Sequence, residues 1–230
     1  MASSKGILLN AFGRLFVREG TVSAVSSLGE HFRSITLSGP SLRSATWLAG
    51  DKLQVLLPSL DVRTYTPVRW DAAAGSTELL VYHHGQSPGA VWSRTVAVGD
   101  TCRFVGPQRS LRVDVDGAAV LFGDETSFAV GRALTSARPG RLTAVFEVES
   151  RAAALPVLAE LGLGDATVVE RRADDQHLAE VAEALVGRGA LLLTGRAQSI
   201  QAVRTRLRAL DAPRPTANKA YWSVGKTGLD

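Results

Sequence analysis

Four neighbouring residues combine a cation, an aromatic ring and hydroxyl groups: Arg63, Thr64, Tyr65 and Thr66. They follow an apolar run, 53–57, that is typical of a strand. A tyrosine ring offers a stacking face, a threonine hydroxyl can bond the edge of a planar ligand, and a guanidinium pairs with phosphate. Flavin nucleotides have the matching groups: a planar ring, polar atoms at its edge and phosphates. Because side chains alternate along a strand, Arg63 and Tyr65 should share one face. The alternative is ordinary surface packing at a strand end, since so short a motif is weak evidence alone.

A second stretch, 82–93, is rich in small residues and precedes a predicted helix over 89–96. Free backbone amides at a helix start form an anion site, although a plain turn would have the same composition. His83 and His84 are adjacent, so on a strand they point to opposite faces. No carboxylate or cysteine stands at ligand spacing, which argues against a metal site and favours one histidine bordering the flavin.

Three further stretches lie in the second half of the chain. Residues 121–126 and 193–196 each predict a strand, a tight turn and a helix start, the usual cofactor position in a parallel sheet. The first contains two carboxylates and no glycine-rich fingerprint, so Asp124 and Thr126 could equally cap the helix. The second places Arg196 where a phosphate could bind. At 218–226, two aromatic residues between lysines predict either a terminal strand or a tail that covers a flavin face.

The elements that must position these residues change character along the chain. Residues 7–18 have helical spacing of apolar side chains and predict a lead-in helix, so that residues 1–19 precede the first domain. Over 20–116, short strands separated by Gly and Pro turns predict a small antiparallel β-barrel. Over 117–230, apolar strands alternate with helices, which predicts a parallel α/β sheet.

Bulk composition excludes several classes of protein. The net charge of +4 is spread along the chain, which favours an anionic small molecule and not nucleic acid. The single cysteine rules out an internal disulfide and a cysteine-based metal cluster. No apolar run has membrane-spanning length, and the N-terminus lacks the layout of a secretory signal. We therefore expect a cytoplasmic protein, whose oligomeric state the sequence does not define.

Taken in order, these stretches make the chain resemble the siderophore-interacting proteins, a branch of the ferredoxin-reductase-like flavoproteins. The resemblance runs from Val22 to Gly225 and includes the dipeptide 106–107. It implies a flavin-binding barrel, a nicotinamide-nucleotide-binding α/β domain, and FAD at their junction. It also implies reduction of a ferric chelate, which releases iron because hard oxygen ligands bind the ferrous ion less tightly.

The resemblance also assigns residues. It implies that Arg63 contacts FAD phosphate, that Tyr65 stacks on the isoalloxazine and that Thr66 bonds its edge, so the last two lie at the reacting ring. The pyrophosphate and adenine side would be lined by Ser87, Gly89, Ala90 and Trp92. Further cofactor-binding candidates are Thr64, His83, Gly85, Asp124, Glu125, Thr126, Arg196 and Trp222, of which residues 124–126 would meet the nicotinamide nucleotide. Cations for an acidic ferric siderophore would be Lys52, Lys219 and Lys226.

The expected activity is an FAD-dependent oxidoreductase that passes electrons from NAD(P)H, or another donor, to a ferric chelate. One alternative is a flavin reductase or biosynthetic enzyme whose acceptor is an organic molecule or a partner oxygenase. A second alternative is a binding protein of the same fold without catalysis. Because the flavin carries the redox chemistry, the lack of an acid–base dyad agrees with the two enzyme hypotheses.

Overall fold

The computed structural model describes residues 17–83, 85–212 and 214–225 of the 230-residue chain. It divides into two compact units, Met1–Ser110 and Leu111–Asp230, a few residues before the division expected from the sequence. The body of the predicted lead-in helix, His84 and Lys226 lie outside the described residues. The first strand begins at Val17, so it includes the last residues of the pattern that predicted that helix.

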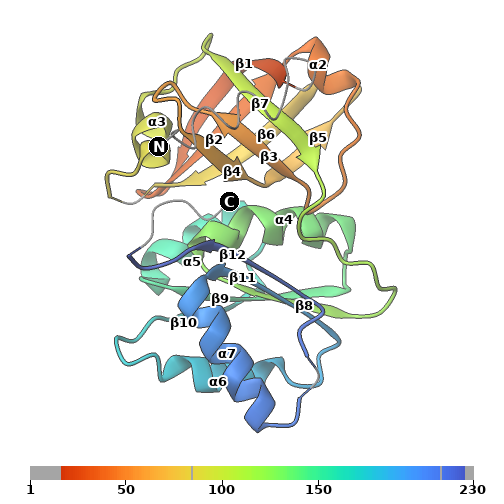
Figure 1. The fold of residues 1–230 in the computed structure, drawn as a ribbon, viewed down its shortest axis with the longest axis vertical. Coiled ribbons are helices and arrows are strands. Elements are labelled where there is room, and N and C mark those ends of the chain that lie inside the picture. Colours follow the sequence, from red (N-terminus) through yellow and green to blue (C-terminus); the bar gives the residue numbers. More distant parts are fainter. Residues whose placement is uncertain (1–16, 84, 213, 226–230) are drawn as a thin grey trace, which may run out of the picture. The chain divides into compact units, whose positions relative to one another are not determined.

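The first unit is built on a seven-stranded sheet whose neighbouring strands are all antiparallel, with the order β4-β3-β7-β1-β2-β6-β5 (Figure 1). Its strands are β1 (Val17–Leu28), β2 (Phe32–Ser38), β3 (Lys52–Leu56), β4 (Val62–Tyr65), β5 (Pro67–Asp71), β6 (Ser76–Tyr82) and β7 (Thr101–Gln108). Its helices are α2 (Pro40–Arg43) and α3 (Pro88–Thr95).

The seven-stranded sheet must curl, because its two edge strands are consecutive in the chain. Only Thr66 separates β4 from β5, so the two edges of the sheet lie next to each other, as a barrel requires. Alternate residues of the strands fill the interior, among them Ile35, Leu53 and Phe104. The antiparallel barrel expected from the regular strand spacing is thereby confirmed.

The second unit is a five-stranded parallel sheet with the order β10-β9-β8-β11-β12. Its strands are β8 (Ala119–Gly123), β9 (Leu142–Val148), β10 (Thr167–Glu170), β11 (Ala190–Arg196) and β12 (Ala217–Trp222). Its helices are the 3₁₀ turn η1 (Glu125–Ser127), α4 (Phe128–Ala137), α5 (Arg151–Glu160), α6 (His177–Leu185) and α7 (Ala197–Ala209). Strand and helix alternate, as predicted. The C-terminal aromatic stretch is a strand, β12, which pairs with β11.

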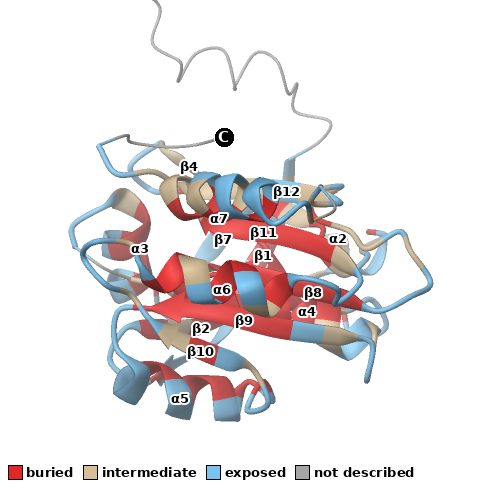
Figure 2. Cartoon of the chain, turned by 90° about the horizontal axis from the view of Figure 1, so that it is seen from below, coloured by how far each residue is buried: buried red, intermediate tan, exposed pale blue. Residues whose placement is uncertain are grey.

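Helices cover both faces of the parallel sheet, so its central strands are apolar on both sides. Figure 1 shows α6 and α7 on one face, where they pack on β8, β9 and β11. On the other face α4 approaches closely at Gly131, where an added Cβ would lie 2.8 Å from the Phe146 ring. Figure 2 shows β8, β9 and β11 almost wholly buried. None of the described helices is both long and apolar enough to cross a membrane.

Candidate functional site

The first candidate site lies where the N-terminal end of α3 meets β4. In β4, Arg63 lies opposite Val55 and Tyr65 opposite Leu53 across the β3 pairing. Val55 and Leu53 both point into the barrel core, so Arg63 and Tyr65 share one face, as the strand alternation predicts. A Cβ added to Gly89 would lie 2.9 Å from the Tyr65 hydroxyl and 3.6 Å from Arg63 Cγ. The backbone of α3 therefore contacts this face at a position that has room only for glycine.

Helix α3 begins with a capped turn. The Ser87 hydroxyl accepts a hydrogen bond from the Ala90 N–H, and Pro88 stands at the first helical position, where no donor is needed. The Val91 N–H bonds the Ser87 carbonyl. Within the described part of the chain, this leaves the Gly89 N–H as the unpaired amide of the first turn, beside the stem of Arg63. A cation and a free helix amide side by side form an anion site.

Two aromatic rings pack against each other at this site. The Tyr65 and Trp92 centroids are 5.7 Å apart with the rings tilted by 39°, and Trp92 is buried. Burial raises the pKa of Tyr65 well above its ordinary value, against the opposing charge of Arg63 and with a smaller contribution from Cys102. The phenol therefore stays neutral near pH 7. Tyr65 can stack and donate a hydrogen bond, but it does not supply a base.

The remaining barrel candidates are more dispersed. The Thr64 Oγ1 is buried and has no hydrogen-bond partner in the described chain, and Thr66, between β4 and β5, is buried. His83 is fixed elsewhere: its Nε2 contacts the Glu30 carbonyl at 3.0 Å. Burial lowers the pKa of His83; the bond to Glu30 opposes this shift, and nearby cations add to it. No described contact joins His83 to Arg63 or Tyr65.

Helix α3 also secures the turn that precedes it. The Arg94 guanidinium donates to the Gly85 carbonyl with both terminal nitrogens, each at 3.2 Å. Gly85 itself has a φ of 60°, in the left-handed region that favours glycine. The predicted turn residues Gly85 and Ser87 therefore shape the start of α3.

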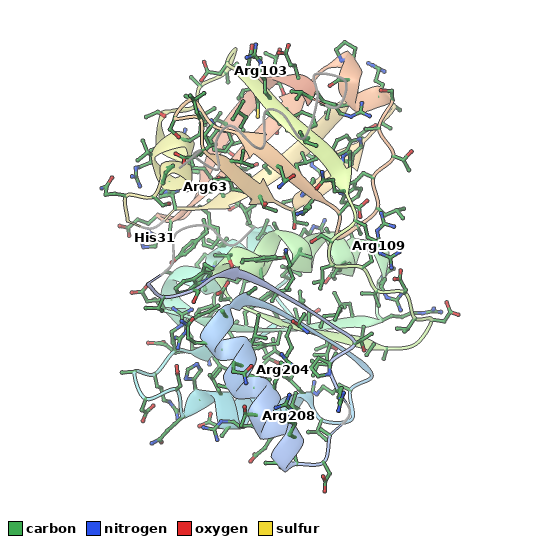
Figure 3. The ribbon with its side chains drawn as sticks, viewed as in Figure 1. His31, Arg63, Arg103, Arg109, Arg204 and Arg208 are labelled. Carbon is green, nitrogen blue, oxygen red and sulfur yellow. The ribbon has the colours of Figure 1, made fainter. Side chains whose placement is uncertain are left out.

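The charged Arg63 side chain, labelled in Figure 3, turns one nitrogen back to the Val62 carbonyl at 2.7 Å.

The second candidate site is the point where the order of the parallel strands reverses, between β8 and β11. Here Gly195, with a φ of 90°, packs so closely that an added Cβ would lie 2.6 Å from the Asp124 carboxylate. The Trp222 indole N–H, on β12, donates to the same carboxylate at 2.7 Å. Asp124 also accepts from the backbone N–H of Thr126 at 2.9 Å and from its hydroxyl. The structure thus brings together three of the predicted residues: Asp124, Thr126 and Trp222.

The two carboxylates of this turn are directed into the protein and not toward solvent. Asp124 is fully buried, and burial raises its pKa to about 6; the Thr126 and Trp222 bonds lower it, and Glu125 and Glu147 raise it. Glu125 is nearly buried as well, and it bonds the Glu149 N–H at 2.5 Å and Arg171 at 3.1 Å. Their role in this structure is to hold the turn, as the capping interpretation proposed for Asp124.

Arg196 is occupied by a protein partner. One of its terminal nitrogens lies 2.9 and 3.0 Å from the two carboxylate oxygens of Asp175. The sequence interpretation, in which Arg196 meets a phosphate, would require this pair to open. The lysine candidates are far apart in the sequence: Lys52 lies on β3 and Lys219 on β12, in different units.

Sequence reasoning missed a buried ionic cluster at the ends of β9 and β10. The His177 Nε2 lies 2.8 Å from Glu147, and both side chains are fully buried. The His177 Nδ1 accepts from the Arg172 N–H at 3.3 Å, which leaves Nε2 to face Glu147. Arg171 forms an ion pair with Glu125, and its Nε lies 3.9 Å from the Glu147 Oε1. The available signal was a glutamate inside the apolar run of β9, which indicates a buried, partnered carboxylate.

The first site fits FAD by its own chemistry. A diphosphate needs a cation and free amides, which Arg63 and Gly89 supply, and a planar ring needs an aromatic wall, which Tyr65 supplies. Among the described residues, no three His, Cys, Asp or Glu side chains gather as a metal site would require.

Comparisons with known proteins agree with this assignment. Residues 58–111 match the model of the siderophore-interacting FAD-binding domain. No curated protein matches the sequence. A siderophore utilization protein from T. fusca has a TM-score of 0.74 at 20% identity, over 93% of this chain and 95% of its own. The ferredoxin-NADP+ reductase of Plasmodium falciparum has a TM-score of 0.70 at 8% identity, over 90% and 98%. The Amycolatopsis cytochrome P450 reductase GcoB has a TM-score of 0.67 at 20% identity, over 90% and 70%.

The family model matches the part of the chain that contains Arg63, Tyr65 and Gly89, and the structural matches extend over both units. The resemblance inferred from the sequence is thereby confirmed: residues 58–111 match the siderophore-interacting FAD-binding domain, and the fold of the chain is similar to that of a siderophore utilization protein and of a ferredoxin-NADP+ reductase.

Proposed function

We propose that the protein is an FAD-dependent oxidoreductase that passes electrons from NAD(P)H to a ferric chelate and thereby releases iron. The observation that carries this proposal is the contact of the α3 start with β4, where Gly89 adjoins Arg63 and Tyr65. One NAD(P)H supplies a hydride, which is two electrons, so two ferric ions are reduced and one proton is released. A bound FAD would supply the chemistry that accepts two electrons as a hydride and passes them on one at a time.

The residues of the chain provide binding and orientation in this proposal. Arg63 and the Gly89 N–H neutralise the diphosphate, and the Tyr65 ring supports one face of the isoalloxazine. The Tyr65 phenol is neutral near pH 7, so it adds no negative charge to this site. No residue has to exchange a proton with the substrate, since hydride and electron transfer need neither a general acid nor a general base.

Flavin binding is tested first, by titrating FAD into the purified protein and following flavin absorbance and fluorescence. We expect Arg63→Ala to weaken FAD binding at least tenfold, because it removes the cation of the anion site, and the loss should shrink in high salt. Arg103→Ala is the matched control: it removes the same charge from the same unit, in an exposed ion pair with Glu19 (Figure 3). A protein that binds no flavin contradicts the proposal.

Turnover is tested next, under anaerobic conditions, with NADH or NADPH, a ferric chelate and a coloured chelator that traps ferrous iron. The proposal requires about two ferrous ions per nucleotide oxidised. Nucleotide oxidation that proceeds equally well without a ferric chelate contradicts it.

A second candidate function is the reductase component of an oxygenase system. It is favoured by the likeness in fold to GcoB, a cytochrome P450 reductase. In this case the electrons pass to a protein acceptor. Comparing ferric chelates with one-electron protein acceptors such as cytochrome c, at equal flavin loading, separates the two functions by their relative rates.

A further inference from the structure

The carboxyl ends of the parallel strands are where a nucleotide donor is expected to bind. In open α/β sheets, ligands bind outside the carboxyl ends of the strands where the strand order reverses. Here the order reverses between β8 and β11, and β9 is the next strand on the other side of β8. In the dinucleotide-binding sheets of this kind, a carboxylate that follows the first strand and helix bonds the 2′-hydroxyl of the adenine ribose, or a nearby arginine accommodates a 2′-phosphate.

Glu125 ties three strand ends together at this edge. It follows β8; its Oε1 accepts the backbone N–H of Glu149, directly after β9, at 2.5 Å. Its Oε2 pairs with Arg171, directly after β10, at 3.1 Å. Because Glu125 and Arg171 have only 7% and 19% exposed side chains, this pair is shielded from solvent and fixes the backbone of Glu149.

Glu149 presents a free carboxylate at the second strand end. The residue is exposed, and its side chain has no hydrogen-bond or ion-pair partner among the residues that the structure describes. The same position in the chain therefore combines a fixed backbone with an unpaired acceptor. A carboxylate accepts hydrogen bonds from a ribose diol and repels a 2′-phosphate.

The arginines around Glu149 are each bound to a protein acceptor. Arg151 donates to the Val168 carbonyl at 2.9 Å, which turns it toward β10. Arg171 is held in the buried cluster, and Arg172 pairs with Glu180 at 2.9 Å. Arg171 and Arg172 are thus compensated by carboxylates and Arg151 is directed to a carbonyl of β10, so no described arginine pairs with the Glu149 carboxylate, whose charge disfavours a phosphorylated ribose.

We propose that Glu149 is the residue that selects the nucleotide, by bonding the adenine ribose diol of NADH and excluding the 2′-phosphate of NADPH. The proposal deepens the proposed function, since it assigns NADH as the electron donor of the same enzyme. The Glu149 carboxylate would repel the 2′-phosphate of NADPH and also accept hydrogen bonds from the ribose diol of NADH, so it would disfavour one nucleotide while favouring the other.

The test measures binding alone, by calorimetry of the FAD-loaded full chain with ADP-ribose and with its 2′-phosphate. We expect the wild-type protein to bind ADP-ribose at least tenfold more tightly. Glu149→Gln should reduce this ratio at least fivefold, because it removes the charge and keeps the size. Glu160→Gln, the same charge change at the exposed far end of α5, is the matched control and should leave the ratio unchanged.

Several outcomes overturn the proposal: tighter binding of the 2′-phosphate, a ratio unaffected by Glu149→Gln, or binding of neither compound. Loss of the 2′-phosphate's affinity in Arg151→Gln, together with a wild-type preference for it, would identify Arg151 as the selecting residue instead. Flavin binding and ferric reduction with another electron donor are measured separately, so failure here leaves the proposed function to be judged on its own evidence.

Discussion

The Trp222 indole N–H donates to the buried Asp124 carboxylate at 2.7 Å, which joins the last strand of the parallel sheet to the turn after its first. Residues 98 positions apart in the chain are thereby connected at the point where the strand order reverses. Trp222, on the C-terminal strand, therefore holds this turn in place. The sequence pattern had left a terminal strand and a tail that covers a flavin face as alternatives.

We predict that Trp222→Phe lowers the free energy of unfolding by about 1–3 kcal/mol, because it leaves an oxygen of a buried carboxylate without its donor. Chemical denaturation followed by circular dichroism measures the change. In an Asp124→Asn background the same substitution should cost at least about 1 kcal/mol less, since the coupling is lost. Equal costs in both backgrounds would show that the two side chains do not interact energetically.

The stability of the second unit should depend on pH through Asp124. Burial raises its pKa from 3.8 to about 6 in the folded protein. Between these values the folded state holds a proton that the unfolded state releases, so the contribution of Asp124 to stability is fully present below pH 3.8 and is lost as pH rises through about 6. Relative to Asp124→Asn, the wild type should lose about 2–3 kcal/mol of unfolding free energy between about pH 4 and pH 7. A difference that stays constant across this range contradicts the prediction.

The barrel site was accessible to sequence reasoning because its determinants are local. Strand alternation places Arg63 and Tyr65 on one face, and the Ser87-Pro88 sequence marks a helix start. Similarly, the alternation of strand and helix after residue 117 defines a parallel sheet, and parallel strands bring the turns at 123 and 195 to the same edge.

Long-range partners could not be predicted in this way. Arg196 stands at a turn that suits a phosphate, but Asp175, 21 residues earlier and with a φ of 55°, occupies it. The pair of Glu147 and His177 depends on α6 lying over β9, which periodicity does not define. Propensity and periodicity report which face of an element is buried, whereas side-chain pairing depends on how elements pack.

Tight flavin binding should depend on glycine at position 89. Glycine to alanine in an open helix stabilises by up to about 1 kcal/mol, but here the new Cβ would lie 2.9 Å from the Tyr65 hydroxyl. We expect Gly89→Ala to weaken FAD binding about tenfold or more. Because the closest atom is the hydroxyl, Gly89→Ala combined with Tyr65→Phe should recover most of the affinity of Tyr65→Phe alone. Gly164→Ala, where the structure shows open space, is the control, and FAD titration is the measurement. An unrescued double variant would argue that the N–H position, not the clash, decides binding.

Arg171 and Arg172 are neighbours whose removal should have very different effects. Arg171 is 19% exposed and compensates the buried carboxylates of Glu125 and Glu147, whereas Arg172 and its partner Glu180 are 53% and 60% exposed. Burial lowers the pKa of Arg171, but these carboxylates outweigh that effect and the pKa lies above its ordinary value, so the residue is charged at every accessible pH. Arg171→Met should therefore cost about 3–5 kcal/mol of unfolding free energy, because it leaves buried charges unpaired. Arg172→Met should cost less than about 1 kcal/mol, as exposed ion pairs do. Denaturant unfolding of both variants at neutral pH decides the matter, and similar losses in the two would mean that solvent reaches the cluster and screens it.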